Sequence, residues 1–272
     1  MDITTTHQPT HVPGTVPYPW PYDGIIEPQR TALLICGAQA AISALCERSP
    51  AVLDRILSTA SAVRDAGGTI VWLRHGTTPD RPRRDGRAFL PARHSRGWKL
   101  TATPFPDDLL VDSAGWDGCF GSDLDNTLRI RSIRTIALAG FASEITVDST
   151  VRTLNDQGHE CLVLSDCCAP LDEGLGARAH ASLTMSGGIF GALGTSAEFV
   201  AAVLAALFAA TPSATTPSAT SPSATSPSAT TPSATTPSAT SPSATTPSAT
   251  SPSAATPPTN PAPDTSLEET PR

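Results

Sequence analysis

The sequence predicts a three-layer α/β/α fold, in which helices cover both faces of a mostly parallel β-sheet. Two observations support this prediction. Short apolar runs typical of buried strands alternate with segments that carry apolar residues at helical spacing. The chain has 272 residues and its last part is a low-complexity repeat, which leaves about 200 residues for one domain with a sizeable core.

Strands are expected where apolar residues follow one another without interruption. Residues 31–36 (TALLIC) form such a run, as expected of a strand that is covered on both faces. The other expected strands are 69–74, 109–111, 135–139 and 160–164.

Helices are expected between these strands. In residues 51–66, apolar side chains recur at the spacing of one helical face, and two glycines, Gly67 and Gly68, end the pattern. The other expected helices are 122–130, 146–156, 173–185 and 196–209. Parallel strands joined by helices end at one edge of the sheet, and ligands bind beyond that edge in such folds.

The predicted organisation has three parts: a flexible N-terminus (1–17), one domain (18–210) and a disordered tail (211–272). Within the tail, residues 211–255 repeat a unit such as Thr-Pro-Ser-Ala-Thr. Each proline removes a backbone donor and fixes φ, so neither a helix nor a sheet can propagate. Because the repeat has nothing larger than Ala to bury, we expect a solvated spacer.

Composition excludes several classes of function. The net charge of −7 argues against nucleic acid or an anionic membrane surface as the main partner. No apolar stretch approaches the roughly 20 residues of a membrane span, and the N-terminus lacks the apolar region of a signal peptide. The six cysteines follow neither a metal-ligand spacing nor a disulfide framework. We therefore expect a cytoplasmic protein without a cofactor or a bound metal.

Four parts of the chain resemble the isochorismatase-like cysteine hydrolases, and within them the amidohydrolases that act on small amides and ureido compounds. The resemblance runs from about residue 18 to 204. The matching stretches are YPWPYDG (18–24) leading into TALLICGAQ (31–39), CFGSDL (119–124), GFASEITV (140–147), and GHECLVLSDCC (158–168) with MSGGIFG (185–191). Together, in this order, they imply the isochorismatase-like fold.

The resemblance also implies where catalytic residues would stand. Enzymes of this family use a Cys at a helix N-terminus as nucleophile, an Asp at the end of the first strand as base, and a nearby Lys that lowers the thiol pKa. In this sequence the base position is Gly37, the lysine position is Ser113 and the nucleophile position is Thr146. None of these three positions keeps the family's functional group, which implies that the catalysed rate falls by several orders of magnitude.

The family's oxyanion hole is made of backbone amides, which survive changes of side chain. By resemblance, these amides belong to Ala142 and Thr146, with an unusual peptide bond at Phe141–Ala142. A pocket for a carbonyl or carboxylate group would then persist at the N-terminus of helix 146–156.

Other residues offer alternatives. Cys119 and His75 would form a displaced nucleophile and base, although a Cys beside an aromatic residue is more often part of the packing. A metal site made of His75, Cys119 and either Cys36 or Asp117 lacks the spacing of a known module. We expect Asp166 and Glu144 to cap a helix or bind loop backbone, and Asp148 to pair with Arg152.

The function that we expect is that of a non-catalytic homologue that binds a ligand or a partner. Its expected partners are a small amide-like molecule and further copies of the chain. The alternative is an active hydrolase of a small amide, ureido or isochorismate-like substrate that uses non-standard residues. A third possibility is a structural protein in which the tail serves as a tether.

Overall fold

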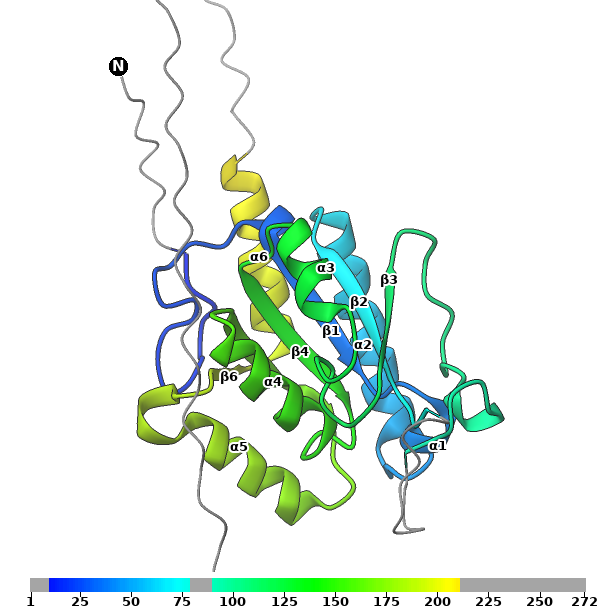
Figure 1. Cartoon of the computed structure of the whole chain (residues 1–272). Helices are drawn as coiled ribbons and strands as arrows, with labels where there is room; N and C mark the ends of the chain where they lie inside the picture. The colour runs from blue at the N-terminus through cyan, green and yellow to red at the C-terminus, as the bar shows by residue number, and fades with distance from the viewer. Residues whose placement is uncertain (1–9, 79–89, 211–272) are drawn as a thin grey trace, which may run out of the picture. The chain divides into compact units, whose positions relative to one another are not determined.

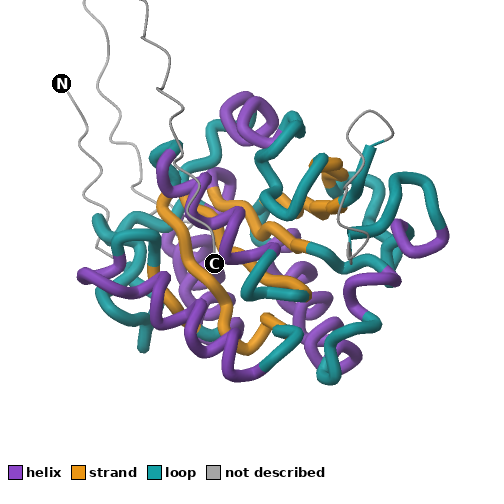
Figure 2. The backbone as a smooth tube through the Cα atoms, turned by 60° about the horizontal axis from the view of Figure 1, so that its bottom comes forward, coloured by secondary structure: helices purple, strands orange, loops and turns teal. Residues whose placement is uncertain are grey.

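The computed structural model describes residues 10–78 and 90–210. The predicted tail (211–272) lies outside the described residues, as do residues 1–9 of the predicted N-terminal segment. Within the described part, the predicted α/β/α fold is confirmed, because one six-stranded sheet lies between helices on both faces (Figures 1 and 2). No helix in this part is long and apolar enough to span a membrane.

All strands of the sheet run parallel, in the order β3-β2-β1-β4-β5-β6. They are β1 (Thr31–Cys36), β2 (Thr69–His75), β3 (Leu109–Ser113), β4 (Thr135–Phe141), β5 (Glu160–Ala169) and β6 (Ala192–Gly194). The first five lie where apolar runs predict strands. β6 has no predicted counterpart, because its 3 residues are too few to show a period.

The helices connect these strands. They are α1 (Ala40–Ser43), α2 (Ser49–Asp65), α3 (Leu124–Ile130), α4 (Thr146–Asp156), α5 (Glu173–Gly188) and α6 (Ser196–Ala210). The bounds of α4 agree with the prediction. α5 extends past its predicted end, but Met185, Ser186 and Gly187 leave helical geometry, so its regular part stops where the sequence predicts.

Alternate residues of each strand face opposite helical layers, because side chains along a strand point to alternate faces of the sheet. Leu33 and Ile35 of β1 belong to a core that includes α2 and α6. Leu34 and Cys36 of β1 belong to a second core that includes α3, α4 and Leu183 of α5. In Figure 1, α3, α4 and α5 lie in front of the sheet, and α2 and α6 lie behind it. Both faces of the sheet are therefore buried.

Residues 10–17 pack on the domain, so the prediction of a flexible segment is wrong for them. Val12 is 1 % exposed and pairs with Trp20. Val16 and Leu193 of β6 exchange two backbone hydrogen bonds of 3.0 and 2.8 Å. The segment thus protects the outer edge of β6, and its prolines suit an edge position, where few backbone donors are needed.

β5 contains an irregularity near its middle. Leu138 of β4 pairs with Val163, but Gly140 pairs with Cys168, so β5 holds extra residues between the two pairs. Such bulges bend a strand and redirect its side chains. Here the extra residues include Asp166, whose side chain leaves the sheet and reaches the start of α6.

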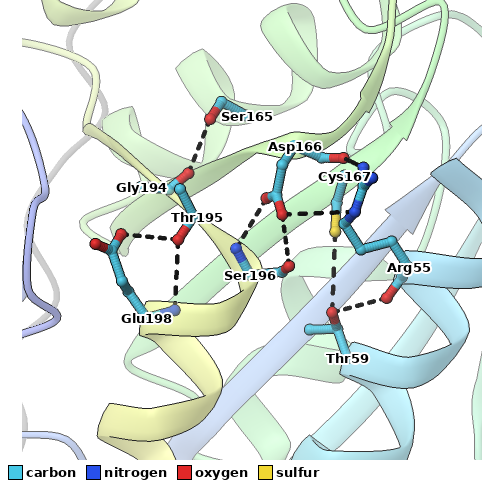
Figure 3. A network of polar contacts seen from close by, with 9 residues as sticks. All are labelled: Arg55, Thr59, Ser165, Asp166, Cys167, Gly194, Thr195, Ser196 and Glu198. Carbon is cyan, nitrogen blue, oxygen red and sulfur yellow. Dashed lines mark hydrogen bonds and ion pairs between the residues drawn. The ribbon is translucent and has the colours of Figure 1, made fainter.

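Asp166 joins three elements (Figure 3). Its carboxylate accepts hydrogen bonds from the backbone N–H and the hydroxyl of Ser196, at 2.8 and 2.6 Å. Arg55 of α2 lies 3.8 Å from the same carboxylate. Thr195 and Glu198 add a hydroxyl-to-carboxylate hydrogen bond of 2.7 Å within the first turn of α6. The predicted capping role of Asp166 is confirmed, and it ties β5 to α2 and α6.

Replacing Asp166 by Ala should lower the free energy of unfolding by about 1–2 kcal/mol, because the α6 N-terminus loses its cap and Ser196 loses both acceptors. Urea unfolding followed by circular dichroism measures this. Asp54→Ala, at an exposed position of α2, is the control and should change stability by less than about 0.5 kcal/mol. Equal effects of the two substitutions would contradict the capping role.

Candidate functional site

The three positions that correspond to the family triad lie at the carboxyl edge of the sheet. Gly37 follows β1, Ser113 ends β3, and Thr146 begins α4. All three are buried, and Ser113 and Thr146 are 0 % exposed. Gly37 and Thr146 are neighbours, since a Cβ built on Gly37 would lie 3.4 Å from Thr146 Cγ2. Ser113 lies on the other side of β2 from β1.

The hydroxyl of Thr146 has a structural partner. It donates a hydrogen bond of 2.7 Å to the carbonyl oxygen of Phe141, the last residue of β4, and lies 3.4 Å from the carbonyl of Ala142. A hydroxyl becomes a nucleophile when an adjacent base takes its proton, and a backbone carbonyl is not such a base. Thr146 therefore closes the turn between β4 and α4.

Gly37 supplies no carboxylate to this turn. Its φ angle is +65°, and a Cβ on it would lie 3.1 Å from the carbonyl oxygen of Phe141. Its N–H donates to the carbonyl of Leu73 at 3.1 Å. The base position therefore offers only backbone atoms, which lie between β2 and the end of β4.

Gln39 has a structural role that the sequence did not indicate. Its only signal was its place at the end of the stretch 31–39, which resembles the family's first strand. Its side-chain oxygen accepts from the N–H of His75 at 2.7 Å. Its side-chain nitrogen donates to the carbonyls of His75 and Trp98, at 3.1 and 3.2 Å. Gln39 is 0 % exposed, so these buried bonds fix the end of β2 beside Gly37.

Ser113 and His75 form a buried pair across β3 and β2. The Ser113 hydroxyl lies 3.0 Å from His75 Nδ1 and donates to the carbonyl of Gly115 at 2.8 Å. His75 Nδ1 is also 3.1 Å from the Gly115 carbonyl, whereas Nε2 is buried without a hydrogen-bond partner in the described part of the chain. Burial lowers the pKa of His75 to about 4, so the imidazole is neutral at pH 7.

The two amides of the expected oxyanion hole are used inside the protein. Ala142 N–H points to the sulfur of Cys46 at 3.4 Å. Thr146 N–H donates to the carbonyl of Ala142 at 2.9 Å. The Phe141–Ala142 bond is also not cis, and Ala142 instead has a φ of +50°. The expectation of two open amides beside an unusual bond is therefore wrong for this structure. Cys46, which occupies one of these amides, lies in none of the stretches that resemble the family, so the sequence did not indicate its role.

The displaced pair of Cys119 and His75 is not formed. The Cys119 thiol points to Gln157 Oε1 at 3.9 Å, and His75 Nδ1 faces Ser113 and Gly115. Burial and the carboxylate of Asp117 raise the pKa of the Cys119 thiol to about 12. No group of three or more His, Cys, Asp or Glu side chains in the described ranges is placed to hold a metal ion.

The acidic residues near the turn have the structural roles that the sequence predicts. The Glu144 carboxylate accepts from the N–H groups of Leu171 and Asp172, at 2.8 and 3.2 Å. Asp148 and Arg152 form an ion pair of 2.8 Å, one turn apart on α4. Glu144 thus stabilises the loop after β5 and Asp148 stabilises α4, and neither serves as a base for Thr146.

Comparisons with known proteins agree with the fold. The family profile described as Isochorismatase domain matches residues 31–198. Two ureidoacrylate amidohydrolases named RutB are similar: one from Methylorubrum extorquens, 27 % identical over 42 % of this chain and 56 % of its own length, and one from Variovorax paradoxus, 30 % identical over 54 % and 67 %. The chain thus spans about half the length of the first of these curated relatives.

Solved structures show the same architecture. A cysteine hydrolase from Pseudomonas syringae aligns with a TM-score of 0.62 at 24 % identity, over 66 % of this chain and 95 % of its own. The nicotinamidase PncA from Bacillus subtilis aligns with a TM-score of 0.53 at 19 % identity, over 60 % and 98 %. At these identities the likeness shows the fold alone.

The buried His75 predicts a loss of stability in acid. Its pKa is about 4 in the folded chain and about 6.5 when unfolded, so the unfolded state takes up the proton first as the pH falls. The free energy of unfolding should be highest above about pH 6.5, where His75 is neutral in both states. It should fall by at most about 3 kcal/mol between about pH 6.5 and 4. Urea unfolding at a series of pH values measures it. His75→Asn should show a shallower dependence, and an unchanged slope would contradict the prediction.

Cys119 should react slowly with thiol reagents. With a pKa of about 12, roughly one thiol in 10⁴ is ionised at pH 8, and the thiolate is the reactive form. Iodoacetamide should therefore label native Cys119 at least about 100-fold more slowly than the same residue in urea. Mass spectrometry measures the rates, with Cys119→Ser to identify the peptide. Rapid labelling of native Cys119 would show an activated thiol and contradict the prediction.

Proposed function

The chain belongs to the isochorismatase family, and we propose that this member is catalytically inactive and works by binding a partner. The observation that carries the proposal is the hydrogen bond of 2.7 Å that commits the Thr146 hydroxyl to Phe141. The base position beside it, Gly37, has no side chain. The family's proton transfers and bond formation then have no group to perform them.

The N–H groups of Ala142 and Thr146 are already hydrogen-bonded within the protein, which favours a protein partner over a small amide-like ligand. A carbonyl group seated in the family's manner would have to displace Cys46 from Ala142 N–H and open the first turn of α4. The buried Nε2 of His75, which lacks a partner in the described residues, is the feature that favours a small ligand. The amides decide between the two, because they are the groups that would bind the carbonyl of such a ligand.

A cytoplasmic location is part of the proposal. All six cysteines are free thiols, and five of them are buried. Free thiols persist in reducing compartments, where disulfides are rare.

One observation favours a second candidate, a hydrolase that uses Ser113 and His75. The hydroxyl and the imidazole nitrogen are 3.0 Å apart, as in a nucleophile and its base. Two facts weigh against it. Both residues are 0 % exposed, and a base with a pKa of about 4 is poorly matched to neutral pH.

An ammonia-release assay with ureidoacrylate and nicotinamide, the substrates named for similar proteins, tests the proposal. We expect the wild-type chain to stay within about tenfold of the uncatalysed rate. Loss of a triad costs roughly 10⁴–10⁶ in rate, and the amides that would supply the remaining catalysis are hydrogen-bonded inside the protein. Thr146→Ala should give the same background rate.

Two outcomes would contradict inactivity. Turnover that Thr146→Ala lowers at least about 100-fold would show an active threonine. Turnover that is insensitive to Thr146→Ala but lost in both Ser113→Ala and His75→Ala would establish the second candidate. Circular dichroism spectra and unfolding curves of each variant separate lost chemistry from lost folding.

A further inference from the structure

Three arginines line one hollow at the edge of the sheet where the strands begin. Arg30 directly precedes β1, Arg134 directly precedes β4, and Arg129 lies in the last turn of α3. The rest of the lining is residues 132–133 and 157–159, and the hollow has a volume of 390 Å³. Because parallel strands all begin at one edge, this hollow lies at the opposite end of the sheet from the three family positions.

Each of these arginines pairs with one carboxylate, and none of the three carboxylates lines the hollow. The pairs are Arg30 with Glu27 at 3.0 Å, Arg129 with Asp125 at 2.9 Å, and Arg134 with Asp23. Such a pair orients a guanidinium group but uses only some of its five N–H donors. The hollow therefore has cationic walls and no carboxylate among its lining residues.

Several of the guanidinium donors have no hydrogen-bond partner within the described part of the chain. Arg129 binds both oxygens of Asp125 through Nε, which leaves its two Nη groups. Arg134 uses only Nη2. Arg30 uses Nε for the carbonyl of Ser132 and Nη1 for its carboxylate, which leaves Nη2. Since all three side chains line the hollow, these N–H groups are available to an occupant.

The other walls of the hollow are uncharged. Gly158 has a φ angle of +87°, and a Cβ built on it would meet nothing within 4 Å, so the space beside its backbone is open. His159 is 9 % exposed, and burial lowers its pKa, so its imidazole is neutral at pH 7. The charge of the walls thus comes from arginines, which stay protonated. An occupant that uses them has to be an anion.

We propose that this hollow binds a phosphate group, either free or carried by a small molecule. A phosphate monoester has a charge of about −1.5 to −2 at pH 7 and three acceptor oxygens. A carboxylate has one charge and two oxygens. Three guanidinium groups match the phosphate, because each can donate to a different oxygen. This inference goes beyond the proposed function and does not depend on whether the chain has catalytic activity.

Isothermal titration calorimetry of the full chain with inorganic phosphate, at constant ionic strength, tests the proposal. We expect saturable binding with a Kd of roughly 0.1–1 mM, because the guanidinium groups are partly exposed and the net charge of −7 opposes an anion. Acetate should bind at least about tenfold more weakly, since it has less charge and fewer oxygens. No saturable binding of phosphate, or acetate binding as tight as that of phosphate, would overturn the proposal.

Arg129→Gln should raise the Kd for phosphate at least about fivefold, because it removes one charge from the wall. Its cost in stability is small, since the lost ion pair with Asp125 is exposed. The control is Arg48→Gln. The Arg48 side chain is 59 % exposed and that of Arg129 62 %, and Arg48 pairs with Glu173, away from the hollow. This variant loses the same charge and should keep the wild-type Kd. Equal weakening by both substitutions would show attraction to overall charge and overturn the proposal.

Chemical modification locates the bound phosphate. Phenylglyoxal reacts with arginine side chains, and phosphate should slow its reaction with Arg129 and Arg134 but not with Arg48, as measured by mass spectrometry of peptides. Equal protection of Arg48 would contradict the location. Titration with glycerol 3-phosphate separates the two sources of the group. Tighter binding of this ester than of inorganic phosphate supports a phosphorylated small molecule, and the reverse order supports free phosphate.

Discussion

The hydrogen bond between the Thr146 hydroxyl and the carbonyl of Phe141 is the constraint on which the carboxyl edge of this sheet depends. It is the first of a buried series. The carbonyl of Thr146 accepts from the Thr150 hydroxyl at 2.6 Å, and that hydroxyl accepts from the N–H of Gly118 at 2.8 Å. The series links β4, α4 and the loop after β3. Threonine side chains thus complete the backbone hydrogen bonding of a region where a thiol hydrolase needs an unoccupied nucleophile.

The fold and the chemistry of this family are separable in physical terms. The sheet is held by apolar side chains that alternate between two cores, and the three family positions lie at the carboxyl edge of the strands. Their replacement leaves the layers intact. The polar groups that do hold the edge, such as Gln39 and Glu144, bind backbone amides or carbonyls and require no substrate. An inactive chain can therefore keep the whole architecture.

The sequence predicts those parts of the structure that depend on local pattern. Five strands follow from apolar runs, and the bounds of α4 follow from helical spacing between two strands. β6 and residues 10–17 could not be predicted, because they hold each other through the pairing of Val16 with Leu193, residues far apart in the chain. The substitutions at the site are visible in the sequence. The occupation of Ala142 N–H by Cys46 is not, since it depends on a contact between distant loops.

The left-handed backbone at Gly37 makes the loss of the catalytic carboxylate difficult to reverse. Most L-residues are disfavoured at φ +65° by roughly 1–2 kcal/mol, and Asp pays less of this penalty than most. A restored Asp would also bring its first carbon within 3.1 Å of the Phe141 oxygen, which already receives the Thr146 proton. A single mutation back to Asp would therefore meet an altered chain path, and nearby residues would have to change first. Recovery of the family's reaction in this chain would therefore take coordinated changes at several positions and not the return of one carboxylate.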